Sequence, residues 1–179
     1  MGPKITLTEL LDARERRAAR QKTLLVAYPG HTLISLTVNT PGPVKRPPEA
    51  DRLFEAGRRE LLAALSNAGL VPVHRETVRP STGCELRLLV PAEPMALKRL
   101  TCELETRLPY GRLLDADVLD AAGRPLSRGA LNLPERGCIV CGREGAYCAS
   151  RRLHPLEEIF AAFTRIAGTL SEETPCGRS

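Results

Sequence analysis

Apolar residues recur at helical spacing in four segments of the chain, and strand-like runs lie between them. Thr6 and Glu9 have the spacing of a capping box, which predicts a helix that ends near Tyr28, before Pro29 and Gly30. Further helices are predicted over residues 51–68, 91–108 and 155–170, and strands over residues 33–38, 71–78, 85–90 and 111–120.

After the first helix, the predicted order is strand, helix, strand, strand, helix, strand. This order is typical of an antiparallel sheet with two helices on one face, the ferredoxin-like arrangement. We therefore expect an α+β fold of β-α-β-β-α-β order, with an extra N-terminal helix and a Cys-rich C-terminal helical extension. Residues 1–130 are expected to form the α+β core, and residues 131–179 the extension packed on it.

The first helix carries polar residues within its predicted apolar stripe. At helical spacing the stripe consists of Leu7, Leu11, Arg14, Ala18, Gln21 and Leu25. A guanidinium on an inward face requires a carboxylate or phosphate partner, so Arg14 is either part of a structural salt bridge or an anion ligand. Arg16, Arg17 and Arg20 lie off this stripe, which predicts that they are solvated.

Two acids, Asp115 and Asp117, stand two residues apart in an otherwise apolar run. Because side chains alternate between the faces of a strand, both carboxylates are expected on one face. Two carboxylates on a half-buried face repel each other and require a cation, a basic partner or a shared proton. A divalent metal that holds a polyphosphate is one such partner, since hard cations choose oxygen ligands. The alternative is a solvated, inert pair at the end of a strand.

A proline-rich loop follows the predicted strand over residues 33–38. Prolines restrict the backbone of residues 39–48, which predicts a stiff loop rather than a mobile one. Asn39 opens this loop, and Lys45 and Arg46 lie toward its end. The loop is therefore a candidate for receiving an anion, and the alternative is a plain connector with basic residues that aid solubility.

The C-terminal third contains a cluster of metal-ligand residue types. Cys138 and Cys141 form a CxxC pair, and Cys148 and His154 follow within a few residues. A close first pair followed by a third Cys and a His is the pattern of a Cys3His zinc knuckle. The alternative is a set of small buried thiols. A thioredoxin-type redox role is not expected, because the CxxC does not open a helix after a strand.

The composition restricts the class of protein. The 179 residues suffice for one domain with an appendage, and the core must be aliphatic, since aromatics make up 3% and Trp is absent. The net charge of +5 suits an anionic ligand or an acidic protein partner. The sequence shows no nucleic-acid motif, no apolar run of ~20 residues and no secretion signal. We expect a cytoplasmic protein that binds neither nucleic acid nor membrane.

Several segments, taken in order, resemble one family. They are residues 10–17 with Gln21, residues 35–45 (Ser-Leu-Thr-Val-Asn-Thr-Pro-Gly-Pro-Val-Lys), residues 111–118 (Gly-Arg-Leu-Leu-Asp-Ala-Asp-Val), residues 126–128, the three clustered Cys, and residues 154–158. In these segments the chain is similar to the apo-citrate lyase phosphoribosyl-dephospho-CoA transferases, also called citrate lyase holo-acyl-carrier-protein synthases. The loop at residues 39–45 and the strand at residues 111–118 are the most specific parts of the resemblance.

The resemblance implies a definite reaction of the nucleotidyltransferase type. A member of this family attaches 2'-(5''-triphosphoribosyl)-3'-dephospho-CoA to a serine of the citrate lyase acyl carrier protein (gamma) subunit, and diphosphate is released. For this chemistry we predict that Asp115 and Asp117 hold Mg²⁺ and that one of them accepts the serine proton. The expected substrate-binding residues are Lys45, Arg112, Asn39 and Arg14.

Two alternatives remain open at this point. The first keeps the fold and the metal but changes the substrate, which gives a related nucleotidyltransferase that acts on another carrier protein or a small molecule. The second is a non-catalytic, zinc-stabilised adaptor, in which Asp115 and Asp117 form salt bridges with Arg14 and Arg112. A metal-free route, with one aspartate as general base and one proton shared by the pair, is the remaining variant of the mechanism.

Overall fold

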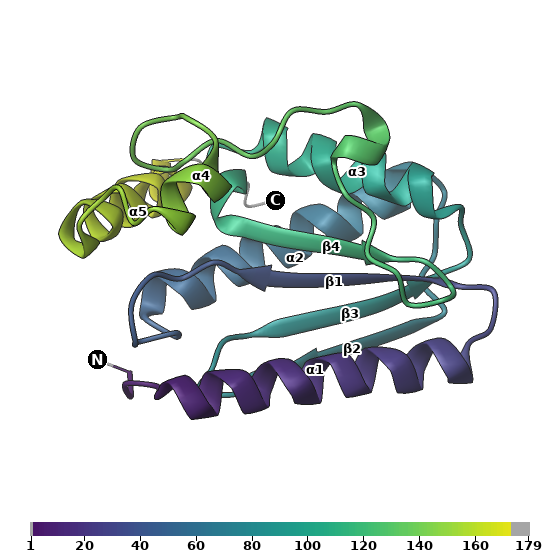
Figure 1. Ribbon diagram of the computed structural model, residues 1–179. Coiled ribbons are helices and arrows are strands. Elements are labelled where there is room, and N and C mark those ends of the chain that lie inside the picture. Colours follow the sequence, from purple (N-terminus) through teal and green to yellow (C-terminus); the bar gives the residue numbers. More distant parts are fainter. Residues whose placement is uncertain (1, 173–179) are drawn as a thin grey trace, which may run out of the picture.

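The computed structural model describes residues 2–172, and it begins with a long helix packed against a sheet (Figure 1). The helix α1 (Leu7–Ala27) has the predicted capping box, since the Thr6 hydroxyl accepts from the Glu9 amide and the Glu9 carboxylate accepts from the Thr6 amide. The other helices are α2 (Pro48–Asn67), α3 (Pro94–Arg107), α4 (Gly145–Ser150) and α5 (Leu156–Glu172), with short 3-10 turns η1 (Gly111–Leu113) and η2 (Gly129–Leu131).

Four strands form one antiparallel sheet. They are β1 (Thr32–Val38), β2 (His74–Val78), β3 (Glu85–Val90) and β4 (Leu114–Leu119). Their order across the sheet is β2-β3-β1-β4, so β1 and β3 are central and β4 is an edge strand. The expected α+β class, with an antiparallel sheet and an extra N-terminal helix, is confirmed.

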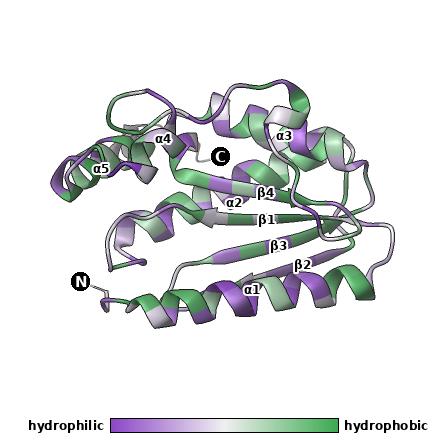
Figure 2. Cartoon of the chain, in the orientation of Figure 1, coloured by the Kyte–Doolittle hydropathy of each residue, from purple (hydrophilic) through white to green (hydrophobic). Residues whose placement is uncertain are grey.

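Helices cover both faces of the sheet. The main core lies between the sheet and α2 and α3, where Ile34, Leu36, Leu88, Ala116 and Val118 are buried. On the opposite face α1 contributes Leu24 and Leu25 to a smaller apolar cluster with Leu33, Leu89 and Leu119. Figure 2 shows that α1 alternates between apolar and polar residues along its length, so this second face is only partly apolar. None of the described helices is long and apolar enough to cross a membrane.

Several predicted boundaries differ from the observed ones, each for a local reason. The second strand starts at His74 rather than at residue 71, because Val71 and Val73 are exposed and the register with β3 begins at His74, although the Val73 amide still donates to the Leu89 carbonyl at 2.8 Å. The helices α2 and α3 start at Pro48 and Pro94. Backbone N–H groups in the first turn of a helix have no acceptor within the helix, so proline, which has no N–H, suits this position. The expected C-terminal extension over residues 131–179 includes Cys176, which lies outside the described residues.

The predicted inward stripe of α1 was wrong over its N-terminal part. Leu7, Leu11 and Arg14 of this stripe are exposed, whereas its last member, Leu25, is buried together with Ala13 and Leu24. Arg17 and Arg20, which were expected to be solvated, face the sheet instead. Arg17 pairs with Glu85 at 2.9 Å, and Arg20 pairs with Glu76 at 2.9 Å. Carboxylates on β2 and β3 thus make an arginine-bearing helix face compatible with packing on the sheet.

The chain after β4 passes over α3 and ends in the helices α4 and α5. After β4 a turn folds back, and Leu126 donates to the Val118 carbonyl at 2.8 Å. The chain then passes over α3 and reaches α4 and α5 near the start of β4 (Figure 1). Phe163 and Ala167 of α5 join the main core, so this C-terminal helix packs on the rest of the fold. The proposed division at residue 130 stays a prediction.

Candidate active site

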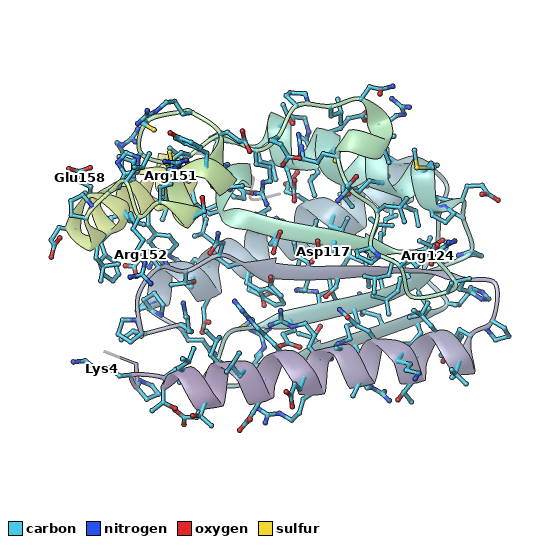
Figure 3. All side chains as sticks on the ribbon, viewed as in Figure 1. Lys4, Asp117, Arg124, Arg151, Arg152 and Glu158 are labelled. Atoms are coloured by element: carbon cyan, nitrogen blue, oxygen red, sulfur yellow. The ribbon has the colours of Figure 1, made fainter. Side chains whose placement is uncertain are left out.

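Asp115 and Asp117 lie on the same face of β4, as the alternation predicts. The intervening Ala116 is buried in the main core, and the two aspartates point to the opposite face, the side of α1. Across the ladder, Thr37 of β1 is the partner of Asp115, and Ser35 is the partner of Asp117. Figure 3 shows Asp117 midway along β4. The edge position of β4 leaves this pair open to solvent on one side.

A cavity of about 270 Å³ adjoins the two aspartates along the free edge of β4, and we call it the β4 cavity. Its charged lining residues come from α3, η1, β4 and the segment that follows β4. They comprise four cations and four carboxylates: Lys98, Arg112, Arg128 and Arg136, with Glu105, Asp115, Asp117 and Glu135. The cavity therefore has many charged groups and no formal net charge, which is an unusual lining for an inert surface depression.

Arg136 connects the aspartate pair to the backbone around it. Its Nη1 lies 3.2 Å from Asp115 Oδ1 and 3.8 Å from Glu105 Oε1. Its Nη2 donates to the carbonyl of Leu114, and to that of Arg112 at 3.0 Å. One guanidinium thus fixes both the carboxylate of Asp115 and the turn from η1 into β4.

Glu105 of α3 secures the edge of β4. Its Oε1 accepts from the backbone amide of Ala116 at 3.0 Å, and its Oε2 lies 3.0 Å from Arg128 Nη1. The Ala116 amide would otherwise lack a partner on the free edge of the sheet. Burial raises the pKa of Glu105, with Arg136 and the Ala116 amide opposing the shift.

The pKa of Asp117 is raised above its usual value. Asp117 is solvent-accessible, yet protein atoms crowd its carboxylate, and this partial desolvation is the main cause. The negative charge of Asp115 adds to the shift, whereas Lys98, Arg17 and Arg136 oppose it. The ionised form of Asp117 is therefore disfavoured, and a proton or a bound cation would relieve this.

Arg112 is the one predicted substrate-binding residue that lines the β4 cavity. Its Nε donates to the Gly137 carbonyl, and its guanidinium lies against Gly145. A Cβ on Gly145 would come within 2.9 Å of Arg112 Nη2, so a glycine gives the guanidinium room. Burial and the nearby Arg136 lower the pKa of Arg112.

Asn39, Lys45 and Arg14 lie at the end of β1 rather than in the lining of the β4 cavity. The Asn39 amide donates to the Leu113 carbonyl at 2.8 Å, which places the proline-rich loop beside the start of β4. Lys45 Nζ donates to the Thr40 carbonyl at 2.8 Å. Partial burial lowers the pKa of Lys45, and so does the nearby Arg14. The two cations therefore form a positive patch next to the loop.

The four predicted metal ligands come together. The side-chain ligand atoms of Cys138, Cys141, Cys148 and His154 all lie within 4.8 Å of one another, and we call this set the Cys3His cluster. Cys141 Sγ lies 3.6 Å from Cys148 Sγ and 3.3 Å from His154 Nε2. Hydrogen bonds from Arg143 lower the pKa of Cys141 to about 6. These residues can bind a metal ion.

Sequence reasoning missed Lys98, Glu105, Arg128 and Arg136 as members of the cavity. Lys98 and Glu105 are charged residues of α3, a type that usually lies on a helix surface, and Arg128 and Arg136 lie in an irregular segment. No spacing rule connects these residues with Asp115, because tertiary packing brings them together.

Comparisons with known proteins agree on one family. The family model described as "Apo-citrate lyase phosphoribosyl-dephospho-CoA transferase" matches residues 5–169. A Streptococcus pyogenes protein named "Probable apo-citrate lyase phosphoribosyl-dephospho-CoA transferase" is 38% identical over 92% of this chain and 86% of its own length. A Citrobacter koseri protein named "Apo-citrate lyase phosphoribosyl-dephospho-CoA transferase" is 37% identical over 87% of this chain and 84% of its own. The Haemophilus influenzae "Protein CitXG" is 38% identical over 88% of this chain, which spans 34% of that longer protein.

Proposed function

The chain belongs to the apo-citrate lyase phosphoribosyl-dephospho-CoA transferase family, and from this membership we propose that it modifies citrate lyase. The reaction transfers the phosphoribosyl-dephospho-CoA moiety of 2'-(5''-triphosphoribosyl)-3'-dephospho-CoA to a serine of the acyl carrier protein subunit, and diphosphate is released. Family membership supports the transferred phosphoribosyl-dephospho-CoA group and citrate lyase as the acceptor, since both are in the names of the relatives, and the serine of the carrier subunit is our proposal.

The reaction is a nucleotidyl-type transfer. The serine Oγ of the carrier forms a bond to the phosphorus that is attached to the ribose 5'' oxygen. The bond from that phosphorus to the bridging oxygen of the departing diphosphate breaks, and the electron pair leaves with diphosphate. The serine proton passes to a base, and a phosphodiester joins carrier and cofactor.

The arrangement of Asp115 and Asp117 is the observation that carries this proposal. Both carboxylates share one face, both line the β4 cavity, and the free edge leaves room beside them. These features fit a divalent metal, because Mg²⁺ binds through one or two carboxylates and substrate phosphates. Mg²⁺ bound there would neutralise charge on the triphosphate and the departing diphosphate.

Asp115 and Asp117 have different surroundings, which suggests different roles. Arg136 holds Asp115 in one orientation at 3.2 Å. No such ion pair is present at Asp117 in the described chain, and its pKa is raised, so it is the better proton acceptor. We assign Asp117 as the group that takes the serine proton, and Asp115 as the fixed carboxylate that helps to hold the metal.

The phosphates and the carrier require cationic partners. Arg112 lines the β4 cavity and is the nearest of the predicted phosphate ligands, and Lys98 and Arg128 add two further cations. Lys45 and Arg14, with Asn39 beside them, are placed to bind a more distant anionic group of the same long cofactor. The net charge of +5 favours an acidic carrier subunit.

Three finer assignments accompany this function. The strand order β2-β3-β1-β4 supports a ferredoxin-like core. The thiols of Cys84, Cys102, Cys138, Cys141 and Cys148 are free, which supports a reducing, cytoplasmic compartment. The Cys3His cluster supports bound Zn²⁺.

Intact mass spectrometry of the carrier subunit tests the proposed function. The apo carrier is incubated with the chain, the triphosphoribosyl precursor and Mg²⁺, and we expect a mass gain equal to the phosphoribosyl-dephospho-CoA moiety. Asp117→Asn should lower the rate at least about 100-fold, since it removes the base. Asp120→Asn is the matched control, because Asp120 lies in the turn after β4 and pairs with Arg124.

The result separates the competing functions. Transfer to a different carrier, with none to the citrate lyase subunit, would favour a related nucleotidyltransferase. If the wild type and Asp117→Asn both bind the carrier and neither produces a mass gain, the result would favour the non-catalytic adaptor.

A further inference from the structure

The segment between β4 and α5 contains the Cys3His cluster and one wall of the β4 cavity. We infer that metal binding at the cluster holds this wall in place. The geometry points to a zinc ion in the Cys3His cluster whose function is to fix Arg136 and the adjoining backbone against β4. The catalytic consequence of this inference rests on the proposed function. The metal site itself and its structural effect do not depend on the proposed function.

The four ligand atoms lie close to the spacing of a tetrahedral zinc site. With Zn–S near 2.3 Å and Zn–N near 2.0 Å, tetrahedral ligand atoms stand roughly 3.5–3.8 Å apart. The 3.6 Å between Cys141 Sγ and Cys148 Sγ lies in this range, the 3.3 Å from His154 Nε2 to Cys141 Sγ lies slightly below it, and all four ligand atoms lie within 4.8 Å of one another. Three thiols and one imidazole leave no position open, so the site is of the structural rather than the catalytic type.

The backbone around the CxxC has the turn that a zinc knuckle requires. The Val140 amide points at Cys138 Sγ at 3.5 Å, and the Gly142 amide donates to the Cys138 carbonyl at 2.9 Å. Gly142 has a φ of +75°, a conformation that favours glycine. The turn therefore aims both thiols inward and gives one of them a backbone donor.

His154 has the outer partner that zinc-bound histidines usually have. Its Nε2 faces the thiols, and its Nδ1 lies 3.3 Å from Glu158 Oε2 of α5. A carboxylate at the second ring nitrogen fixes the tautomer that leaves Nε2 free to bind the metal. The cluster thus also ties the start of α5 to the turn at residues 138–142, which we call the knuckle.

The same segment lacks an apolar core of its own. From residue 121 to residue 160, all of which the structure describes, Cys148 alone is buried. The only helices there before α5 are η2, with three residues, and α4, with six. Ile139 packs partly on the main core, but so little buried apolar surface orders a segment weakly, and a bound metal is the usual substitute.

The knuckle is joined directly to the cavity wall. Gly137 pairs with Glu144 across the base of the knuckle, and the Gly145 amide donates to the Arg136 carbonyl at 2.9 Å. The Gly137 carbonyl accepts from Arg112, and Gly145 and Ala146 line the cavity. Arg136 is two residues from the first ligand, Cys138, so the knuckle fixes the backbone that presents its guanidinium to Asp115.

Metal analysis and limited proteolysis of the purified full chain test the site without recourse to activity. We expect about one zinc per chain in the wild type, and much less in Cys141→Ser and in Cys148→Ser. Trypsin should cleave after Arg136 and Arg143 at least about 10-fold faster in these variants and in chelator-treated wild type. Cys84→Ser is the matched control, since Cys84 is buried beside Asp51 and lies outside the cluster.

The transfer assay then tests the effect on the cavity. Zinc loss should reduce carrier modification at least about 10-fold, and adding zinc back to the chelated wild type should restore both activity and protease resistance. Cys84→Ser should retain zinc, resistance and transfer. A wild type that purifies from zinc-supplemented medium without zinc, or a zinc-free chain with unchanged protease resistance, would overturn the inference. A zinc-loaded, resistant wild type that modifies no carrier would instead contradict the proposed function and leave the metal site standing.

Discussion

Arg136 and Asp115 form an ion pair with Nη1 and Oδ1 3.2 Å apart, although 21 residues separate them in the chain. The same guanidinium donates to carbonyls at the turn into β4. Lysine cannot make these contacts together, because it lacks the planar fork of donors. The orientation of Asp115 therefore depends on an arginine at this position.

Replacement of Arg136 should slow the transfer, and the effect should be larger when the new side chain carries no charge. We expect Arg136→Lys to lower turnover about 10-fold and Arg136→Met about 100-fold, because Asp115 then loses its fixed orientation. Steady-state rates of carrier modification measure this effect. Arg124→Met is the control, since Arg124 is exposed and pairs only with Asp120 at the far end of β4 (Figure 3). Equal rates for Arg136→Met and wild type would show that the pair is not needed.

The raised pKa of Asp117 predicts a pH-dependent gain in stability when its charge is removed. In the metal-free protein the ionised carboxylate is disfavoured by desolvation and by Asp115. Asp117→Asn should therefore raise the free energy of unfolding at pH 7, by about 1 kcal/mol or less for such an accessible group. The gain should shrink as the pH falls through the pKa of Asp117, because the native protein then binds the proton that removes the unfavourable charge.

Removing the charge of Asp120 should change the free energy of unfolding in the opposite direction, which makes it a control. Backbone and side-chain donors of Arg124 lower the pKa of Asp120, so its ionised form stabilises the fold. Asp120→Asn should lower stability at pH 7, and the difference should disappear as the pH falls through the depressed pKa. Urea unfolding of both variants at pH 7 gives the two signs, and unfolding at a pH below the depressed pKa of Asp120 tests whether its difference disappears. A loss of stability in Asp117→Asn at pH 7 would contradict the charge repulsion inferred at the aspartate pair.

Gly42 lies against Phe160 of α5, and its replacement should lower the stability of the fold. Its φ is +70°, and a Cβ there would lie 2.4 Å from Cζ of Phe160. Gly30 has a similar φ of +78° with nothing within 4 Å of its Cβ position. Gly30→Ala should cost about 1 kcal/mol from backbone strain, and Gly42→Ala about 2 kcal/mol, because the exposed Phe160 ring must also shift. Chemical denaturation measures both, and equal costs would argue against the packing of Phe160 on the loop.

The sequence predicted the fold elements well because most of them depend on local patterns. The capping box at Thr6 and Glu9 sets the start of α1, and the alternation around Ala116 sets the common face of Asp115 and Asp117. The spacing of the Cys3His residues likewise anticipated that they would meet. Each of these signals lies within a few residues of the feature that it predicts.

The failures arose where distant residues decide the outcome. The apolar pattern of α1 could not show that Glu76 and Glu85 would neutralise Arg20 and Arg17, and so part of its inward face was predicted wrongly. Glu105 similarly gave no sign that it would bind the edge of β4. The partners of these charged side chains are set by tertiary packing, which a single sequence does not display.

Binding of Mn²⁺ to the zinc-loaded chain, followed by electron paramagnetic resonance, tests the role of the aspartate pair most directly. Mn²⁺ prefers oxygen ligands over thiolates, so it reports on the carboxylates rather than on the Cys3His cluster. In the presence of the triphosphoribosyl precursor we expect one bound Mn²⁺ per chain in the wild type and in Asp120→Asn. The double variant Asp115→Asn with Asp117→Asn should bind at least about 100-fold more weakly. Unchanged affinity in the double variant would contradict a metal held by these two residues.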